Sequence, residues 1–190
     1  MILKNAVGMA HQLLLPKVRT ATCLVDATAG NGKDTLFLAL NSLPQAKIWA
    51  FDIQQVAVDK TRQLLVCHGV ADKVQLILAD HCRIPFYVNQ QIYVAMFNLG
   101  YLPVHDHSLT TMPETTEAAL LAVLKLLAPG GVVTVVGYPG HPTGTQEVQM
   151  LEKILPSLPQ SSFTVGCWKM LNQINNPPLL YIIERKERNH

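Results

Sequence analysis

Charged side chains are scarce in this chain: they make up 15% of its 190 residues, whereas typical soluble domains contain about a quarter. Lysine and arginine outnumber aspartate and glutamate by only 15 to 13, so the formal net charge of +2 does not by itself indicate a nucleic-acid partner. Hydrophobic residues amount to 49%, which is enough for a sizeable core. We therefore expect a single domain over residues 1–190, with much of the chain inside a sheet.

Paired cysteines and long apolar runs are also missing. Cys23, Cys67, Cys82 and Cys167 form no CxxC pair and show no metal-ligand spacing, so we interpret them as reduced, buried thiols and expect no metal. No apolar run reaches the ~18 residues of a membrane-spanning helix, and the N-terminus lacks a signal-peptide cleavage pattern. These absences predict a cytoplasmic protein with no membrane partner.

Strand-like and helix-like segments alternate along the chain. Apolar runs typical of buried strands occupy 22–28, 46–53, 74–80, 91–99, 131–138, 163–171 and 178–186. Helical periodicity covers 2–15, 32–43, 54–69, a segment from Pro113 to the LLAPGG stop, and about 145–155. This alternation favours right-handed βαβ crossovers and a mostly parallel sheet with helices on both faces. The short NQINNPP turn near the end predicts a C-terminal hairpin with one antiparallel strand. The predicted fold is a three-layer α/β/α sandwich with a seven-stranded, Rossmann-like sheet.

Polar residues follow four of the predicted strands, at the edge where open α/β sheets bind ligands. The first loop, DATAGNGKDT (26–35), contains glycines that permit close backbone approach, and the helix after it offers free N–H groups. Asp52 is placed to bind both hydroxyls of a ribose, and Asp80 and His81 follow the third strand, where an adenine would lie. Asn98 ends the fourth. Each alone is explained by a turn or a helix cap, but four together predict a nucleoside-containing cofactor.

The first loop distinguishes between two such cofactors. A dinucleotide fingerprint requires a third glycine where this chain has Thr35, and Asp34 stands where a pyrophosphate needs neutral or positive surroundings. An acidic loop suits the sulfonium and α-amino group of S-adenosylmethionine, which makes an NAD-linked oxidoreductase the weaker hypothesis. The predicted cofactor-binding residues are Asp26, Ala27, Thr28, Gly30, Asn31, Gly32, Asp34, Thr35, Asp52, Ile53, Gln54, Asp80, His81 and Asn98.

Several motifs resemble those of the YtqB/MnmM-type class I methyltransferases, a family also labelled rRNA methylases. They are DATAGNGKDT, FDIQ, ILADH, FNLGYLP, TTMPETT, YPGHPTGTQE and LNQINNPPLLYIIERK, and they span about residues 5–186. The resemblance implies a seven-stranded S-adenosylmethionine-dependent methyltransferase. It also implies methylation of the aminomethyl group of wobble 5-aminomethyl-2-thiouridine in tRNA. The chain departs from the family in residues 104–107, Val-His-Asp-His in place of Gly-Gly-Asp-Lys, and in Thr28, where many methyltransferases have glycine.

The FNLGYLP motif suggests how an amine would be methylated. The Asn98 side-chain oxygen and the Leu99 carbonyl would accept N–H bonds and aim the lone pair of the amine. Gly100 would let the backbone approach closely, and Tyr101 would stack on the base or face the developing cation. Because alkylamines are mostly protonated near neutral pH, a proton must leave first. Asp106, His107 and His141 are the candidates that accept it, with solvent as the alternative.

The substrate side is predicted from scattered polar residues, including those of an N-terminal helix and substrate-side segment over 1–20. The predicted substrate-binding residues are Lys4, His11, Lys33, Tyr101, Asp106, His107, Tyr138 and His141. With Lys17, Arg19 and Arg83, the basic members would hold phosphates of a tRNA anticodon stem-loop, whose unstacked bases are accessible. Trp168 and Tyr181 are interpreted as core residues. An rRNA or small-molecule methyltransferase, and a non-catalytic module that only binds the cofactor, stay open, as does the oligomeric state, a homodimer included.

Overall fold

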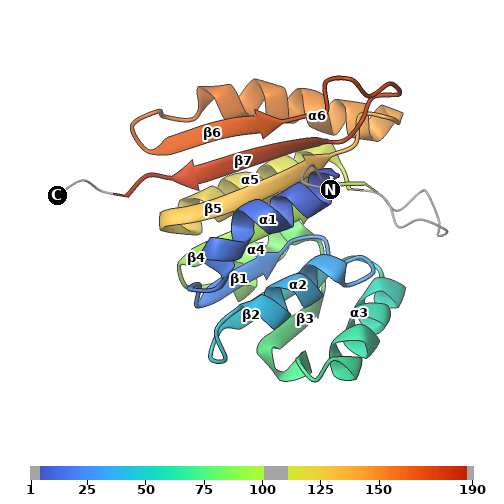
Figure 1. The fold of residues 1–190 in the computed structure, drawn as a ribbon, viewed down its shortest axis with the longest axis vertical. Coiled ribbons are helices and arrows are strands. Elements are labelled where there is room, and N and C mark those ends of the chain that lie inside the picture. The colour runs from blue at the N-terminus through green and yellow to red at the C-terminus, as the bar shows by residue number, and fades with distance from the viewer. Residues whose placement is uncertain (1–4, 101–110, 188–190) are drawn as a thin grey trace.

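The computed structural model describes residues 5–100 and 111–187, in which seven strands form one sheet (Figure 1). The strands are β1 (Cys23–Asp26), β2 (Lys47–Asp52), β3 (Val74–Leu78), β4 (Ile92–Asn98), β5 (Leu127–Gly137), β6 (Phe163–Trp168) and β7 (Leu179–Arg185). The helices are α1 (Ala6–Val18), α2 (Lys33–Asn41), α3 (Gln55–Cys67), α4 (Ile84–Tyr87), α5 (Pro113–Leu126) and α6 (Pro142–Ile154). Three short 3₁₀ turns are η1 (Ala71–Lys73), η2 (His81–Arg83) and η3 (Leu155–Ser157).

The strand order is β3-β2-β1-β4-β5-β7-β6. Pairs among β1 to β5 are parallel, whereas β7 is antiparallel to both β5 and β6. The predicted mostly parallel seven-stranded sheet with one antiparallel strand in the C-terminal hairpin is therefore confirmed. The order reverses between β1 and β4, and this switch point is where ligands bind in such sheets.

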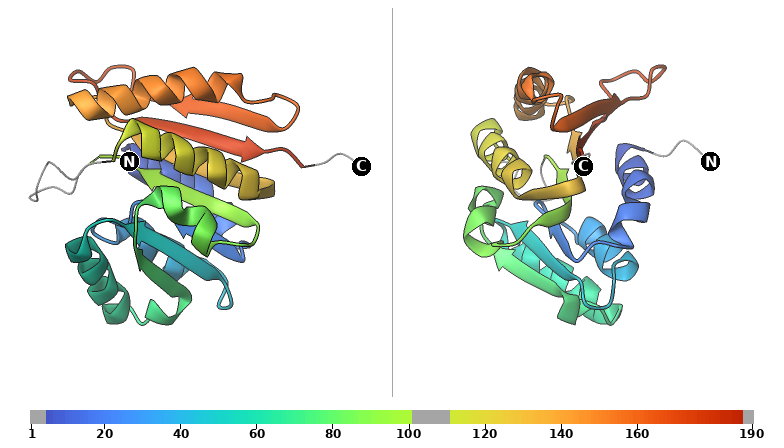
Figure 2. Two further views of the ribbon diagram at one scale, coloured as in Figure 1. Left: turned by 180° about the vertical axis from the view of Figure 1, so that it is seen from behind. Right: turned by 90° about the vertical axis from the view of Figure 1, so that its left-hand side faces the viewer.

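Helices cover both faces of the sheet (Figure 2). Two hydrophobic clusters, one on each face, hold the three layers together. Residues of β1 alternate between them: Cys23 and Val25 face the helices α4, α5 and α6, while Leu24 faces α1, α2 and α3. This is the period-two pattern of a strand buried on both faces. The predicted core position of Tyr181 is confirmed at 4% exposure, and Trp168 packs partly buried against the other cluster.

Several details differ from the sequence-based expectations. The first helix continues through Pro16 to Val18, because a proline in the last turn removes only one late hydrogen bond. The Pro–Gly pair at 129–130 does not separate α5 from the strand: β5 already begins at Leu127, and the pair lies at a register shift opposite β4, where proline is tolerated. The short α4 was not predicted.

The interpretation of all four cysteines as buried was wrong for two of them. Cys23 is buried in β1 and Cys82 is partly buried, but Cys67 and Cys167 are exposed. Cys67 is the last residue of α3, and Cys167 lies on the edge strand β6, of which Thr164–Cys167 face solvent. All four thiols are free.

Candidate active site

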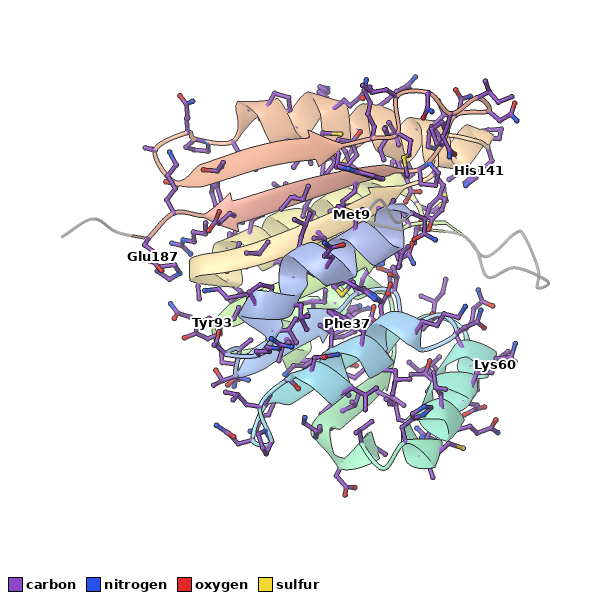
Figure 3. The ribbon with its side chains drawn as sticks, viewed as in Figure 1. Met9, Phe37, Lys60, Tyr93, His141 and Glu187 are labelled. Carbon is purple, nitrogen blue, oxygen red and sulfur yellow. The ribbon has the colours of Figure 1, made fainter. Side chains whose placement is uncertain are left out.

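A cleft of about 710 Å³ opens at the edge where the parallel strands end. Figure 3 shows His141 at this end of the molecule and Tyr93 and Glu187 at the opposite end. The predicted residues that line the cleft are His11, Ala27, Thr28, Gly30, Asn31, Lys33, Asp34, Asp52, Ile53, Gln54, Asp80, His81, Asn98, Leu99, Gly100, Tyr138 and His141. Six lining residues were not predicted: Asn5, Val7, Gly8, Ala29, Ala79 and Thr111. The first three belong to the start of α1, whose polar signal is a single asparagine cap.

Three of the predicted cofactor residues, Asp26, Gly32 and Thr35, belong to the first loop but do not line the cleft. Asp26 is fully buried, and its carboxylate accepts hydrogen bonds from the Thr28 backbone N–H at 3.1 Å and from the Thr35 hydroxyl at 2.5 Å. Burial, reinforced by the neighbouring Asp34 carboxylate, raises the pKa of Asp26 to about 7. Through these two hydrogen bonds Asp26 fixes the conformation of the loop.

Gly32 fixes the turn into α2. Its φ of +79° is in the left-handed region that favours glycine. A Cβ atom at this position would come within 3.0 Å of the Thr61 Cα atom and 3.1 Å of the Leu64 side chain, so the loop and α3 approach too closely for any larger residue. Glycine at this position therefore allows the loop to pack closely against α3.

Asp52 joins the ends of β1 and β2. Its two carboxylate oxygens accept hydrogen bonds from the backbone N–H groups of Gly30, at 2.8 Å, and Gln54, at 2.9 Å. Each oxygen keeps a lone pair for a further donor. Burial raises the pKa of Asp52, and the two backbone hydrogen bonds oppose that effect. Its position in the cleft suits a pair of adjacent hydroxyls.

Asp80 and His81 form the wall beyond β3. The Asp80 side chain accepts a hydrogen bond from the Cys82 N–H at 2.8 Å and so begins η2. The His81 ring is buried and meets the edge of Phe97 at 6.0 Å between centroids. Burial lowers the pKa of His81, although Asp80 and Asp52 oppose the effect. Its Nε2 atom has no hydrogen-bond partner among the described residues.

A continuous polar network crosses the cleft at the end of β4. His11 Nε2 lies 2.6 Å from one oxygen of Asp34, and the other Asp34 oxygen accepts a hydrogen bond from Asn98 Nδ2 at 3.2 Å. Asn98 Oδ1 accepts a hydrogen bond from the Tyr138 hydroxyl at 2.8 Å. The His11 ring is stacked on Phe37, with 4.0 Å between centroids. These contacts fix the orientation of the Asn98 amide.

Thr28, which replaces a common glycine, belongs to the same site. Its hydroxyl oxygen accepts a hydrogen bond from the Asn98 backbone N–H at 2.7 Å. The side chain therefore ties the first loop to the end of β4, and a glycine here would lack that bond.

Of the other predicted substrate-side and proton-accepting residues, the structure describes His141 but not Lys4, Tyr101, Asp106 or His107. His141 is the N-cap of α6, and its Nδ1 atom accepts a hydrogen bond from the Gly144 N–H at 3.0 Å. Lys4, Tyr101, Asp106 and His107 lie outside the described residues, as do Val104 and His105.

Comparison with solved structures identifies the class of protein. A structure from Streptococcus mutans, named a methyltransferase in complex with SAH, is 37% identical, covers 97% of this chain and 99% of its own, and has a TM-score of 0.88. A structure from Clostridium thermocellum, named an rRNA methylase, is 39% identical over 97% of this chain and 100% of its own, with a TM-score of 0.94. Together with the nucleoside-sized acidic cleft at the switch point, these matches define a class I methyltransferase that uses S-adenosylmethionine.

The family follows from the sequence itself. A family model described as "Putative rRNA methylase" matches residues 48–184, and the chain belongs to this family. It is also 33% identical, over 96% of its length and 70% of the relative's, to the chloroplastic tRNA (mnm(5)s(2)U34)-methyltransferase of Arabidopsis thaliana. The resemblance to the YtqB/MnmM-type family is thereby confirmed. Among the described residues, no helix has the length and apolar character needed to cross a membrane.

Proposed function

We propose that this protein methylates the aminomethyl nitrogen of wobble 5-aminomethyl-2-thiouridine in tRNA, giving 5-methylaminomethyl-2-thiouridine. The observation that carries the proposal is the set of acceptors at the end of β4, where Asn98, Asp34 and Tyr138 are joined by hydrogen bonds. These are groups that receive N–H bonds from an amine. The activity named for the plant relative supports the choice of this amine.

The cofactor fits the cleft by charge and by shape. Bound S-adenosylmethionine would supply an electrophilic methyl group on a positive sulfur, and the carboxylates of Asp34, Asp52 and Asp80 that line the cleft complement that charge. Asp52 is placed to hold the ribose hydroxyls, Asp80 and His81 the adenine side, and the loop from Ala27 to Asn31 the amino-acid end.

The residues of this chain orient the attacking nitrogen. Because Tyr138 uses one lone pair of Asn98 Oδ1, a second lone pair is left for an N–H of the amine. The fixed Asn98 amide thus holds the amine in one orientation, which is the main contribution expected of a protein to an in-line displacement. Asp34 is the described carboxylate that contacts Asn98, and it is placed to accept the proton that the ammonium form must lose.

The partner in this proposal is the anticodon stem-loop, bound by a cytoplasmic enzyme. Lys33 is exposed at the cleft and gives the rim a positive charge. Methylation of rRNA is the second candidate, because the family description and the Clostridium thermocellum relative are both named for it.

The experiment is mass spectrometry of nucleosides from RNA incubated with protein and S-adenosylmethionine. The substrates are tRNA that carries 5-aminomethyl-2-thiouridine, the same tRNA without the aminomethyl group, and rRNA. We expect one added methyl on the aminomethyl nucleoside alone. Methylation of rRNA instead would overturn the substrate and keep the chemistry, and cofactor binding without any methylated nucleoside would indicate a non-catalytic module.

A further inference from the structure

Glu147 is a fully buried acid in the middle of α6 and does not line the cleft. Its Oε1 atom accepts a hydrogen bond from the Thr116 hydroxyl of α5 at 3.0 Å. Its Oε2 atom is also buried and has no hydrogen-bond partner among the described residues. A buried carboxyl group is costly to keep unless it does something that an apolar residue cannot do.

The second neighbour of this carboxyl group is Thr111. The Thr111 side chain lies close to the Glu147 carboxyl group, and together with Thr116 it opposes the burial that raises the pKa of Glu147. On its other side, the Thr111 hydroxyl oxygen accepts a hydrogen bond from the Gly100 N–H at 3.0 Å, and the Thr111 N–H donates to the Gly100 carbonyl at 3.4 Å. Glu147, Thr111 and Gly100 therefore form one chain of contacts.

Gly100 lies where the sheet stops supporting the backbone. The Leu99 N–H still donates to the Val136 carbonyl of β5, at 3.0 Å, but Gly100 has a φ of +128° and has left the strand. The described hydrogen bonds of the Gly100 backbone go to Thr111. The direction of the Leu99 carbonyl and of the chain just after Asn98 thus depends on a side chain held from α6.

We propose that Glu147 is a positioning residue for methyl transfer: acting through the Thr111 hydroxyl, it fixes the Gly100 backbone and thereby the acceptors that face the amine. The link to catalysis rests on the proposed function. The link from Glu147 to the Gly100 backbone does not, since it concerns the folded protein without substrate.

The first experiment measures amide hydrogen exchange of Gly100 by NMR in the full chain without RNA. Thr111→Val removes the hydroxyl and keeps the shape of the side chain. It should speed exchange of the Gly100 amide about tenfold or more, because one hydrogen bond is lost. Thr111→Ser keeps the hydroxyl and should preserve protection. Glu147→Leu should speed exchange, whereas Glu147→Gln, which retains an acceptor oxygen, should not. Unchanged exchange in Thr111→Val would overturn the proposal.

The second experiment measures turnover and cofactor affinity with the RNA that wild-type protein methylates. Thr111→Val should lower kcat about tenfold and leave the Kd for S-adenosylmethionine within about twofold. Thr111→Val combined with Glu147→Leu should lower kcat no further than Thr111→Val alone, because both changes break one chain of contacts. Glu152→Gln, an exposed residue of the same helix, is the matched control.

The outcomes separate the two proposals. If wild-type protein methylates no aminomethyl nucleoside, the proposed substrate fails, while the exchange experiment still decides the role of Glu147. If wild-type protein is active and the kcat losses of Thr111→Val and Glu147→Leu simply multiply, Glu147 only stabilises the fold. A fall in melting temperature without loss of Gly100 protection in Glu147→Leu would lead to the same conclusion.

Discussion

Asn98 shows how far a single residue can be interpreted from sequence. Its place at the end of an apolar strand predicted a functional amide, and it does line the cleft. Its partners were not predictable, because Asp34 and Tyr138 are 64 and 40 residues away and meet it only through the strand order. Sequence identified the residue, whereas the fold determines which way its amide points.

Replacing Asn98 by Ala should reduce kcat much more than cofactor binding, by about a hundredfold against a few-fold, because the amide orients the amine. Tyr138→Phe removes the donor to Asn98 Oδ1 and should cost about tenfold in kcat. Steady-state kinetics and calorimetric titration with S-adenosylmethionine measure both effects. Equal losses of turnover and affinity in Asn98→Ala would contradict the role assigned to Asn98.

Asp26 should make stability depend on pH in an unusual direction. Its pKa is about 7 in the fold, against 3.8 for an ordinary aspartate. Between these pH values the folded state therefore binds more protons at Asp26 than the unfolded state, so the contribution of Asp26 to stability is largest below pH 4 and is lost as pH rises towards 7. Asp26→Asn lacks this titration. We expect the melting temperature of the cofactor-free protein to fall more between pH 5 and 8 in wild type than in the variant; parallel profiles would rule this out.

At the scale of elements, α6 is placed by a glycine. A Cβ atom at Gly144 would lie 2.0 Å from the Tyr138 carbonyl oxygen and 2.8 Å from the His141 ring. Only hydrogen fits between the start of α6 and the end of β5. The YPGHPTG sequence predicted a loop and a helix start, but the close approach depends on how two elements pack, which no local pattern reveals.

Gly144→Ala should therefore destabilise the protein by about 1–3 kcal/mol or more, the usual cost of overpacking. Because Tyr138 would have to move, methyl transfer should fall as well. Gly140→Ala, in the same connection, meets no atom within 4 Å and is the control. Thermal unfolding and methyl-transfer activity are measured for both variants. Equal stability of Gly144→Ala and Gly140→Ala would show that α6 can shift to accommodate the added methyl group.

Elements were easier to predict than their ends. Apolar runs located all seven strands, most clearly the buried ones such as Ile92–Asn98, which consist of little else. The start of β5 was missed because a Pro–Gly pair ordinarily marks a stop, and only the neighbouring β4 makes a bulge favourable there. Residues 1–20 were predicted as a substrate-side segment, but Asn5 and Gly8 were not predicted to line the cleft, because they carry no chemical signal of their own.

At the scale of the whole molecule, the fold and the cofactor were predicted and are confirmed, while the RNA partner stays a prediction. The topology of a parallel sheet places residues at strand ends, such as Asp52 and Asp80, on one edge. A shared binding site can therefore be inferred from the sequence alone. RNA binding depends instead on where a few cations lie on a nearly neutral protein. A net charge of +2 leaves that placement open.

Lys33 provides the test of that placement. It is exposed at the cleft, so Lys33→Ala should weaken binding of the anticodon stem-loop and make the salt dependence of binding shallower by about one charge. Lys153→Ala, in the last turn of α6, should change neither. Fluorescence anisotropy at several salt concentrations measures both slopes. Equal effects of Lys33→Ala and Lys153→Ala would indicate that binding depends on the total charge of the protein and not on the position of Lys33.

The position of β7 has a consequence for how the protein is made. β7 is the last strand in chain order, yet it lies between β5 and β6. While a ribosome is still synthesising the chain, β5 has an open edge and β6 has no partner strand. Open, apolar strand edges pair with other chains. Newly made chains should therefore be most prone to aggregate just before β7 emerges, and chains that end before Leu179 should be found in inclusion bodies or bound to chaperones.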